Sequence, residues 1–181
     1  MTKEEKQLIK ECRIMIVGKG DFITYIFITY IKEELRKLEF CKIAEVEIGE
    51  IINEQNTGIL IEYTGVGLSQ AKDINSIPVI YPFDFIEGAG GIVVFPGDDR
   101  SWLDKQNIRL WVAEYISGYC AFWNVDGCDW LHDALHAIKE NRTSDTAMKI
   151  AAYMCARIAA NIAVGKDVKR FPRFYLCRSL E

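Results

Sequence analysis

The chain has 181 residues, half of them hydrophobic, and a formal net charge of −4. This composition excludes a disordered chain and general attraction to nucleic acids or acidic membranes, and the length predicts a single domain over residues 1–181. The chain has six scattered cysteines and no C-x-x-C pair, which predicts free thiols. We recognise no signal peptide and no apolar run long enough to span a bilayer, and we therefore expect a cytoplasmic protein.

The beginning of the chain predicts a strand, a glycine turn and a helix. A charged lead-in, Thr2–Glu11, is expected to form a short helix. The continuous apolar run Ile14–Val17 predicts a strand covered on both faces, and Gly18 and Gly20 interrupt it. Apolar residues then recur every three or four positions in the segment Ile23–Leu38, which predicts an amphipathic helix.

Four more strands are predicted in the middle of the chain. They are Cys41–Ile48, Gly58–Tyr63, Ile77–Tyr81 and Ile92–Phe95. The connections between them are short and rich in turn residues, apart from Leu68–Asn75, where a short helix is expected.

The C-terminal half of the chain is predicted to be helical. Helices are expected at Asn107–Ile116, Asp129–Glu140 and Asp145–Val164, the last of them capped by Ser144, and a final strand at Phe174–Cys177. This order of elements predicts a Rossmann-like α/β fold with a mostly parallel sheet, helices on both faces and a helical C-terminal half.

The glycine turn is the first candidate site. In an open α/β sheet such a turn lies at the carboxyl end of a strand, where backbone N–H groups of Gly18 and Gly20 could meet a phosphate. The full dinucleotide fingerprint requires a third small residue, but that position holds Ile23. Asp21 would repel a phosphate, although it could instead cap the helix. A plain strand-to-helix turn is therefore the alternative interpretation.

Acidic residues near strand ends form the second candidate site. Glu45 and Glu47, at the end of the second strand, are where a residue that contacts a ribose is expected. Asp98 and Asp99 follow the fifth strand and stand next to Arg100, so this group could bind Mg²⁺ or orient a substrate. A polar turn with local ion pairs is the alternative.

Two further patterns have both a chemical and a structural interpretation. Cys128, His132 and His136 follow one another every four positions, but the outer two lie two helical turns apart, and we predict no metal site. Basic residues are concentrated near the C-terminus, where they could form either an anion-binding site or a solvated surface. They are Lys166, Lys169, Arg170, Arg173 and Arg178.

Aromatic residues concentrate in the second half of the chain. Core packing or a subunit interface explains them best. They are Trp102, Trp111, Tyr115, Tyr119, Phe122, Trp123 and Trp130.

Taken together, these segments resemble the ThiF/HesA/MoeB superfamily, the ubiquitin-activating-enzyme-like adenylyltransferases. The resemblance rests on the lead-in with Arg13–Gly20, on Ile77–Ile80, on Gly90–Phe95 and on the alanine-rich helix that ends at Gly165. Members of this family usually dimerise, bind ATP and Mg²⁺, and adenylate the C-terminal glycine of a ubiquitin-like or sulfur-carrier protein.

The resemblance implies a role for each candidate residue. Gly18 and Gly20 would approach the phosphates, Glu47 the ribose, and Asp98 or Asp99 a Mg²⁺ ion. The chain departs from the family where the arginine- and lysine-bearing phosphate segment, the richer glycine loop and the paired C-x-x-C zinc ligands are expected, because none of them is found.

Two hypotheses about function follow. The first is a ThiF-like nucleotide-binding protein that adenylates the C-terminus of a carrier protein. The second is a catalytically inactive Rossmann-like module, a homodimeric scaffold or partner-binding subunit that uses its aromatic and alanine-rich faces. A small-molecule methyltransferase or oxidoreductase is a third class, because it shares the strand–turn–helix start.

Overall fold

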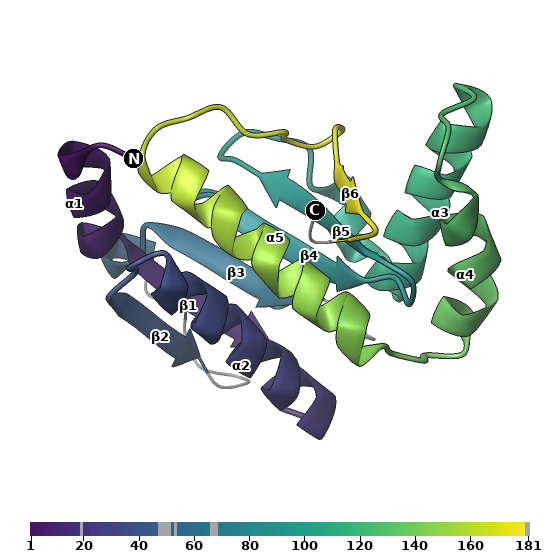
Figure 1. Ribbon diagram of the computed structural model, residues 1–181, viewed down its shortest axis with the longest axis horizontal. Coiled ribbons are helices and arrows are strands. Elements are labelled where there is room, and N and C mark those ends of the chain that lie inside the picture. The colour runs from purple at the N-terminus through teal and green to yellow at the C-terminus, as the bar shows by residue number, and fades with distance from the viewer. Residues whose placement is uncertain (19, 47–51, 53, 66–68, 180–181) are drawn as a thin grey trace.

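A six-stranded sheet forms the centre of the molecule (Figure 1). The computed structural model describes residues 1–18, 20–46, 52, 54–65 and 69–179. The strands are β1 (Arg13–Gly18), β2 (Lys42–Val46), β3 (Ile59–Tyr63), β4 (Val79–Asp84), β5 (Ala89–Val94) and β6 (Tyr175–Cys177). Within the described ranges their order is β2-β1-β3-β4-β5-β6, with β1 to β4 parallel and β5 and β6 antiparallel to their neighbours. The predicted α/β fold with a mostly parallel sheet is confirmed.

Helices cover both faces of this sheet. They are α1 (Lys3–Glu11), α2 (Phe22–Lys37), α3 (Ile108–Phe122), α4 (Asp129–Lys139) and α5 (Asp145–Ala163), with 3₁₀ turns at Glu54–Asn56 and Ser101–Asp104. Figure 1 shows α2 and α5 crossing one face of the sheet and α3 and α4 side by side at the right of the view, and α3 and α4 pack on the opposite face. Among the described helices, none has the length and apolar character needed to cross a membrane.

One hydrophobic core lies between the sheet and the helices α2 and α5. From α2, Phe27, Ile31 and Leu35 are fully buried at the three- to four-residue spacing that the sequence predicts. The buried face of α5 consists mostly of alanines, which let the helix lie close to the sheet and to α2. Ser144 caps α5 by accepting a hydrogen bond from the N–H of Ala147 at 3.2 Å, as predicted.

A second core, on the opposite face, is built around Trp102. Its indole meets the ring of Tyr81 edge-on, with ring centroids 5.2 Å apart. It also stacks on Trp111 and on Phe171, at centroid distances of 6.2 and 5.6 Å. Apolar residues of α3 and α4 complete this core. Part of the aromatic concentration in the sequence therefore belongs to the interior.

The structure corrects two sequence-based expectations. The strand predicted at Ile92–Phe95 begins earlier, because β5 spans Ala89–Val94 and residues 89–91, expected in the preceding connection, already pair with β4 in an antiparallel hairpin. Residues 69–75 form bends and turns instead of the predicted helix, and Leu68 lies outside the described residues. The backbone N–H groups of Gln70 and Ala71 donate instead to the buried carboxylate of Glu62 on β3, at 2.7 and 3.0 Å.

The last residue of β4, Asp84, connects several elements while fully buried. Its carboxylate accepts hydrogen bonds from the N–H groups of Ile86 at 2.8 Å and Ser144 at 2.7 Å, and its carbonyl accepts one from Arg109 Nε at 2.6 Å. Burial raises the pKa of the Asp84 carboxyl and lowers the pKa of the Arg109 guanidinium, and each charge partly offsets the other's shift. This ion pair joins the β4–β5 hairpin to α3 and to the start of α5.

Candidate functional site

The glycine turn lies where the sequence predicts it, at the carboxyl end of β1 and beside the end of β3. Gly18 pairs with Tyr63, and a Cβ at Gly18 would come within 2.6 Å of Thr24 Cγ2 on α2. This glycine therefore permits close packing of the helix on the strand. Chain order places β2 and β3 on opposite sides of β1, so the turn lies at a switch point of the sheet, where ligands bind in open α/β folds.

The amino end of α2 already carries a negative charge. Asp21 caps the helix, and its carboxylate accepts a hydrogen bond from the N–H of Thr24 at 2.7 Å. A phosphate at this helix end would meet a carboxylate. Nearby, Tyr63 stacks on Phe27 with ring centroids 4.4 Å apart, and burial raises the pKa of its phenol to about 12. Tyr63 is therefore neutral near pH 7 and supplies no base.

The acidic candidates after β5 lie at the amino end of the parallel strands, opposite to the carboxyl end where the glycine turn lies. Because β5 is antiparallel to β4, Val94 stands beside Val79 at the amino end of the parallel strands. Asp98, Asp99 and Arg100 follow from there, whereas Gly18 and Gly20 lie at the carboxyl end. The structure thus separates the residues that the family resemblance combines into one nucleotide site.

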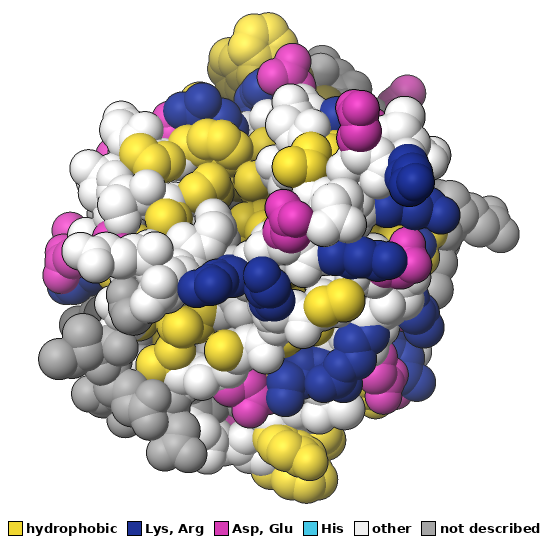
Figure 2. Space-filling view, turned by 90° about the vertical axis from the view of Figure 1, so that its left-hand side faces the viewer, with side chains coloured by type: hydrophobic (Ala, Val, Ile, Leu, Met, Phe, Trp, Pro, Cys, Tyr) yellow, Lys and Arg dark blue, Asp and Glu magenta, His cyan; other side chains and the backbone are white. Residues whose placement is uncertain are grey.

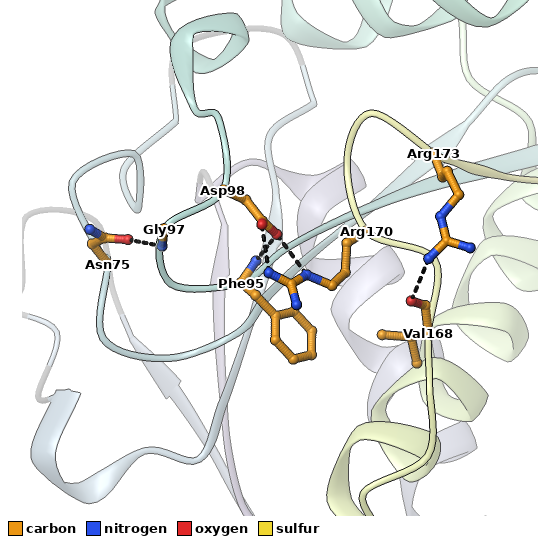
Figure 3. A network of polar contacts seen from close by, with 7 residues as sticks. All are labelled: Asn75, Phe95, Gly97, Asp98, Val168, Arg170 and Arg173. Atoms are coloured by element: carbon orange, nitrogen blue, oxygen red, sulfur yellow. Dashed lines mark hydrogen bonds and ion pairs between the residues drawn. The ribbon is translucent and has the colours of Figure 1, made fainter.

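Asp98 has a structural partner (Figure 3). Its two carboxylate oxygens accept hydrogen bonds from Arg170 Nη2 at 2.6 Å and Nε at 3.0 Å, and one also accepts from the N–H of Phe95 at 2.8 Å. The Arg170 guanidinium holds the pKa of Asp98 below its ordinary value. This bidentate pair fastens the segment after α5 to the end of β5.

Of the remaining predicted site residues, Asp99 and Glu45 have local partners, Arg100 has a buried Nη2 without a hydrogen-bond partner among the described residues, and Glu47 lies outside them. The Asp99 carboxylate accepts a hydrogen bond from the N–H of Ser101 at 2.9 Å, and Arg100 precedes the second 3₁₀ turn. Glu45 pairs with Lys32 on α2 at 2.7 Å. Glu47, the predicted ribose contact, lies outside the described residues.

Replacing Asp98 by asparagine is expected to lower the free energy of unfolding by about 1 kcal/mol at neutral pH. Arg170 depresses the folded-state pKa of Asp98, so this stabilisation is present above the ordinary pKa of about 3.9 and is lost as the pH falls through the folded-state value. Urea unfolding at pH 7 and at about pH 2.5 measures it, and the difference between variant and wild type should be smaller at the lower pH. Replacing the exposed Asp167 by asparagine is the control, and an Asp98 effect as large in acid as at pH 7 would contradict the assignment.

A groove of about 580 Å³ lies between α3, the start of α4 and the C-terminal strand. We call it the α3–β6 groove. Its apolar walls include Tyr115, Tyr119, Val125, Trp130, Phe174 and Leu176. The aromatic residues of α3 and α4 are prominent in the sequence. Their position opposite residues 169–178 was missed, because only the tertiary fold brings these segments together.

The rim of the α3–β6 groove is basic. Lys169, Arg173 and Arg178 line it and are exposed, whereas Asp126 is the acidic residue that lines it within the described ranges. Arg178 pairs weakly with Glu87, at 3.9 Å. Three members of the predicted basic cluster therefore border one groove, in a chain whose net charge is negative. Arg170 does not belong to this rim, since it pairs with Asp98.

Exposed apolar side chains continue from the groove onto the end of α3. Phe122 and Trp123 are 76% and 63% exposed, and Tyr119 and Val125 are 44% and 43% exposed. These four residues form what we call the α3-end patch. Large apolar side chains gathered at one place on the surface are typical of protein interfaces.

A second hollow, of about 670 Å³, lies on the other side of the loop between α3 and α4. Cys120, Cys128 and His132 line it. Burial and the neighbouring Cys128 raise the pKa of the Cys120 thiol to about 12, so it is not a thiolate nucleophile at neutral pH. In the ranges that the structure describes, no three metal-ligating side chains are grouped so that they could hold an ion.

Comparisons with known proteins give structural neighbours alone. The sequence matches no family model and no curated protein. Two solved structures are similar at 10% identity: a heterocyclase in complex with substrate and cofactor, with a TM-score of 0.49, and the heterocyclase TruD, with a TM-score of 0.48. The alignments cover 89% and 88% of this chain but only 20% and 22% of those chains.

Proposed function

We infer that this chain is a catalytically inactive Rossmann-like module that binds a partner protein through the α3–β6 groove and the α3-end patch. The observation that carries this inference is the continuity of the two surfaces. Tyr119 and Val125 belong to both, so an apolar, aromatic groove opens directly onto exposed Phe122 and Trp123. Buried aromatic anchors supply most of the energy in protein interfaces, and this surface offers several of them.

The separation of the predicted nucleotide residues supports the same inference. Adenylation needs the residues that bind Mg²⁺ and those that bind the phosphates to lie close together. Asp98 and Asp99 follow β5 at the amino end of the parallel strands, whereas Gly18 and Gly20 lie at the carboxyl end. Asp98 also already neutralises Arg170. Sequence and structure thus favour a binding role over adenylyl transfer.

A peptide-display selection with the folded chain as bait tests the binding role. Enriched peptides should bind the wild type and lose at least about tenfold in affinity for the double variant Phe122→Ser/Trp123→Ser. The matched control is Phe22→Ser/Tyr25→Ser on α2, because these side chains are equally exposed, at 74% and 69%. Peptides that bind both double variants alike, or no enrichment at all, would contradict the proposal.

ThiF-like nucleotide binding is the second candidate, supported by the position of the glycine turn at the switch point of the sheet. Under the first proposal, millimolar ATP·Mg²⁺ is expected to leave the melting temperature of the chain unchanged. A rise that the exposed-site variant Gly20→Ile abolishes would favour the second candidate, and with it adenylation of a ubiquitin-like or sulfur-carrier protein. Differential scanning calorimetry with and without the nucleotide, at fixed protein concentration, measures the shift.

A further inference from the structure

The C-terminal strand β6 is an open edge of the sheet. It pairs with β5 on one side, and the described strands include none on its other side. The backbone groups on that side are the unpaired row that an additional strand can use. Figure 1 shows β6 at the margin of the sheet, on the side that faces α3.

The α3–β6 groove follows this open edge. Successive side chains of a strand point to opposite faces, and accordingly Leu176 packs with the α3-side core and Cys177 with the α5-side core. Both residues nevertheless line the groove, together with Arg178. The groove therefore runs past the edge of β6 and not only over one face. An extended segment lying there could pair with β6 and place alternate side chains against Tyr119 and Phe174, whose rings meet edge-on with centroids 5.1 Å apart.

Charge selects the kind of segment. Lys169, Arg173 and Arg178 border the groove, whereas Asp126 is the acidic residue among its described lining and Glu87 pairs with Arg178 from outside it, at 3.9 Å. A second copy of this chain that docked with the same surface would bring three more cations to this rim, and like charges placed together oppose association. The opposite side of the molecule does not share this bias, because Figure 2 shows basic and acidic side chains interspersed over it. An acidic partner is therefore favoured.

We propose that the partner binds through an extended segment of alternating acidic and apolar residues, which adds a strand to the open edge of β6. Backbone hydrogen bonds to β6 hold the segment, its apolar side chains enter the α3–β6 groove, and its carboxylates meet the basic rim. This proposal rests on the binding role inferred above and specifies the chemistry and the geometry of the partner.

The probe is an acetylated, amidated and fluorescently labelled octapeptide of the sequence EVEFEVEF, compared with its charge-reversed counterpart KVKFKVKF. Fluorescence anisotropy should show saturable micromolar binding of the acidic peptide and at least about tenfold weaker binding of the basic one. Equal binding of both peptides, or equal binding of a single-stranded oligonucleotide of the same charge, would overturn the proposal, since either would indicate nonspecific contact.

An N-methyl scan of the acidic peptide tests strand addition itself. In a paired strand only alternate N–H groups point to the neighbouring strand, and β6 spans only Tyr175–Cys177, so methylation should weaken binding at the one or two amides that face β6 and be tolerated at the others. Uniform tolerance, or loss at every position, would overturn the assignment to β6.

Variants of the chain test the basic rim. Lys169→Glu/Arg173→Glu/Arg178→Glu should weaken the acidic peptide at least about tenfold, and its melting curve checks that the chain is folded. The matched control is Lys3→Glu/Lys6→Glu/Lys10→Glu on the exposed side of α1, which changes the net charge equally and should alter affinity less than about twofold. Equal losses in both triple variants would overturn the proposal. Peptides selected by display that lose affinity when the α3-end patch is changed, but not when this rim is changed, would support the proposed binding role. That result would overturn only the proposal that the partner binds as an acidic strand.

Discussion

Replacing Asp84 by asparagine is expected to lower the free energy of unfolding by about 3–5 kcal/mol. Asp84 is fully buried, and the side chain of Arg109 beside it is 2% exposed, with its Nη2 3.6 Å from Asp84 Oδ1. Asparagine leaves this guanidinium buried without a compensating charge, and it weakens the bonds from Ile86 and Ser144. The N–H of Ile86 has added importance, because Ile86 has a φ of 70°, which is strained for a β-branched residue.

Urea unfolding at pH 7 measures the effect of this substitution. The matched control is Asp104→Asn, which removes a carboxylate from an exposed ion pair with Lys72 at 3.6 Å and should cost less than about 0.5 kcal/mol. Adding Arg109→Met to Asp84→Asn should recover part of the lost stability, since it removes the uncompensated charge. An Asp84→Asn variant within about 1 kcal/mol of the wild type would show that the buried pair does not hold these elements together.

Replacing Trp102 by alanine is expected to cost about 3–5 kcal/mol. The side chain is 2% exposed and fills the centre of the α3-side core, in contact with Tyr81, Trp111 and Phe171. Alanine would leave a cavity that three surrounding aromatic rings cannot close without losing their own packing. Thermal and urea unfolding of the variant measure the loss.

The matched substitution Trp102→Phe distinguishes packing from hydrogen bonding. Trp102 Nε1 is buried and has no hydrogen-bond partner among the described residues, so phenylalanine removes an unsatisfied donor while it keeps most of the apolar volume. It should cost less than about 1.5 kcal/mol. Equal losses for alanine and phenylalanine would contradict the assignment, because a buried aromatic ring would then stabilise the core no better than a methyl group.

Local patterns predicted the elements of the fold well. The apolar run of β1, the three- to four-residue spacing of Phe27, Ile31 and Leu35, and the Ser144 cap all act within a few residues of one another, so the sequence alone reveals them. The helix predicted at Leu68–Asn75 is wrong, since residues 69–75 form bends and turns, and the N–H groups of Gln70 and Ala71 donate to Glu62, a buried acid on the preceding strand. Sequence periodicity contains no signal for such a bond.

The arrangement of the candidate sites was not predictable in the same way. Whether Asp98 lies near Gly18 depends on the direction of β5, and a four-residue hairpin turn decides that direction. Asp98 binds Arg170, which is distant in sequence, and no local pattern connects the two. The α3–β6 groove likewise requires two distant segments to meet, although each is conspicuous in the sequence, one for its aromatic residues and the other for its positive charge.

The pairing of β6 with β5 makes binding and completion of the sheet thermodynamically linked. One wall of the groove exists only while Leu176 is paired beside Gly90, which lies far earlier in the chain. Any molecule that occupies the groove therefore binds the form in which β6 is paired with β5 in preference to a form in which β6 has detached. By mass action, it stabilises the paired form. Conversely, a substitution that loosens the pairing of β6 with β5 weakens binding in the groove, even if it alters no residue that the bound molecule contacts.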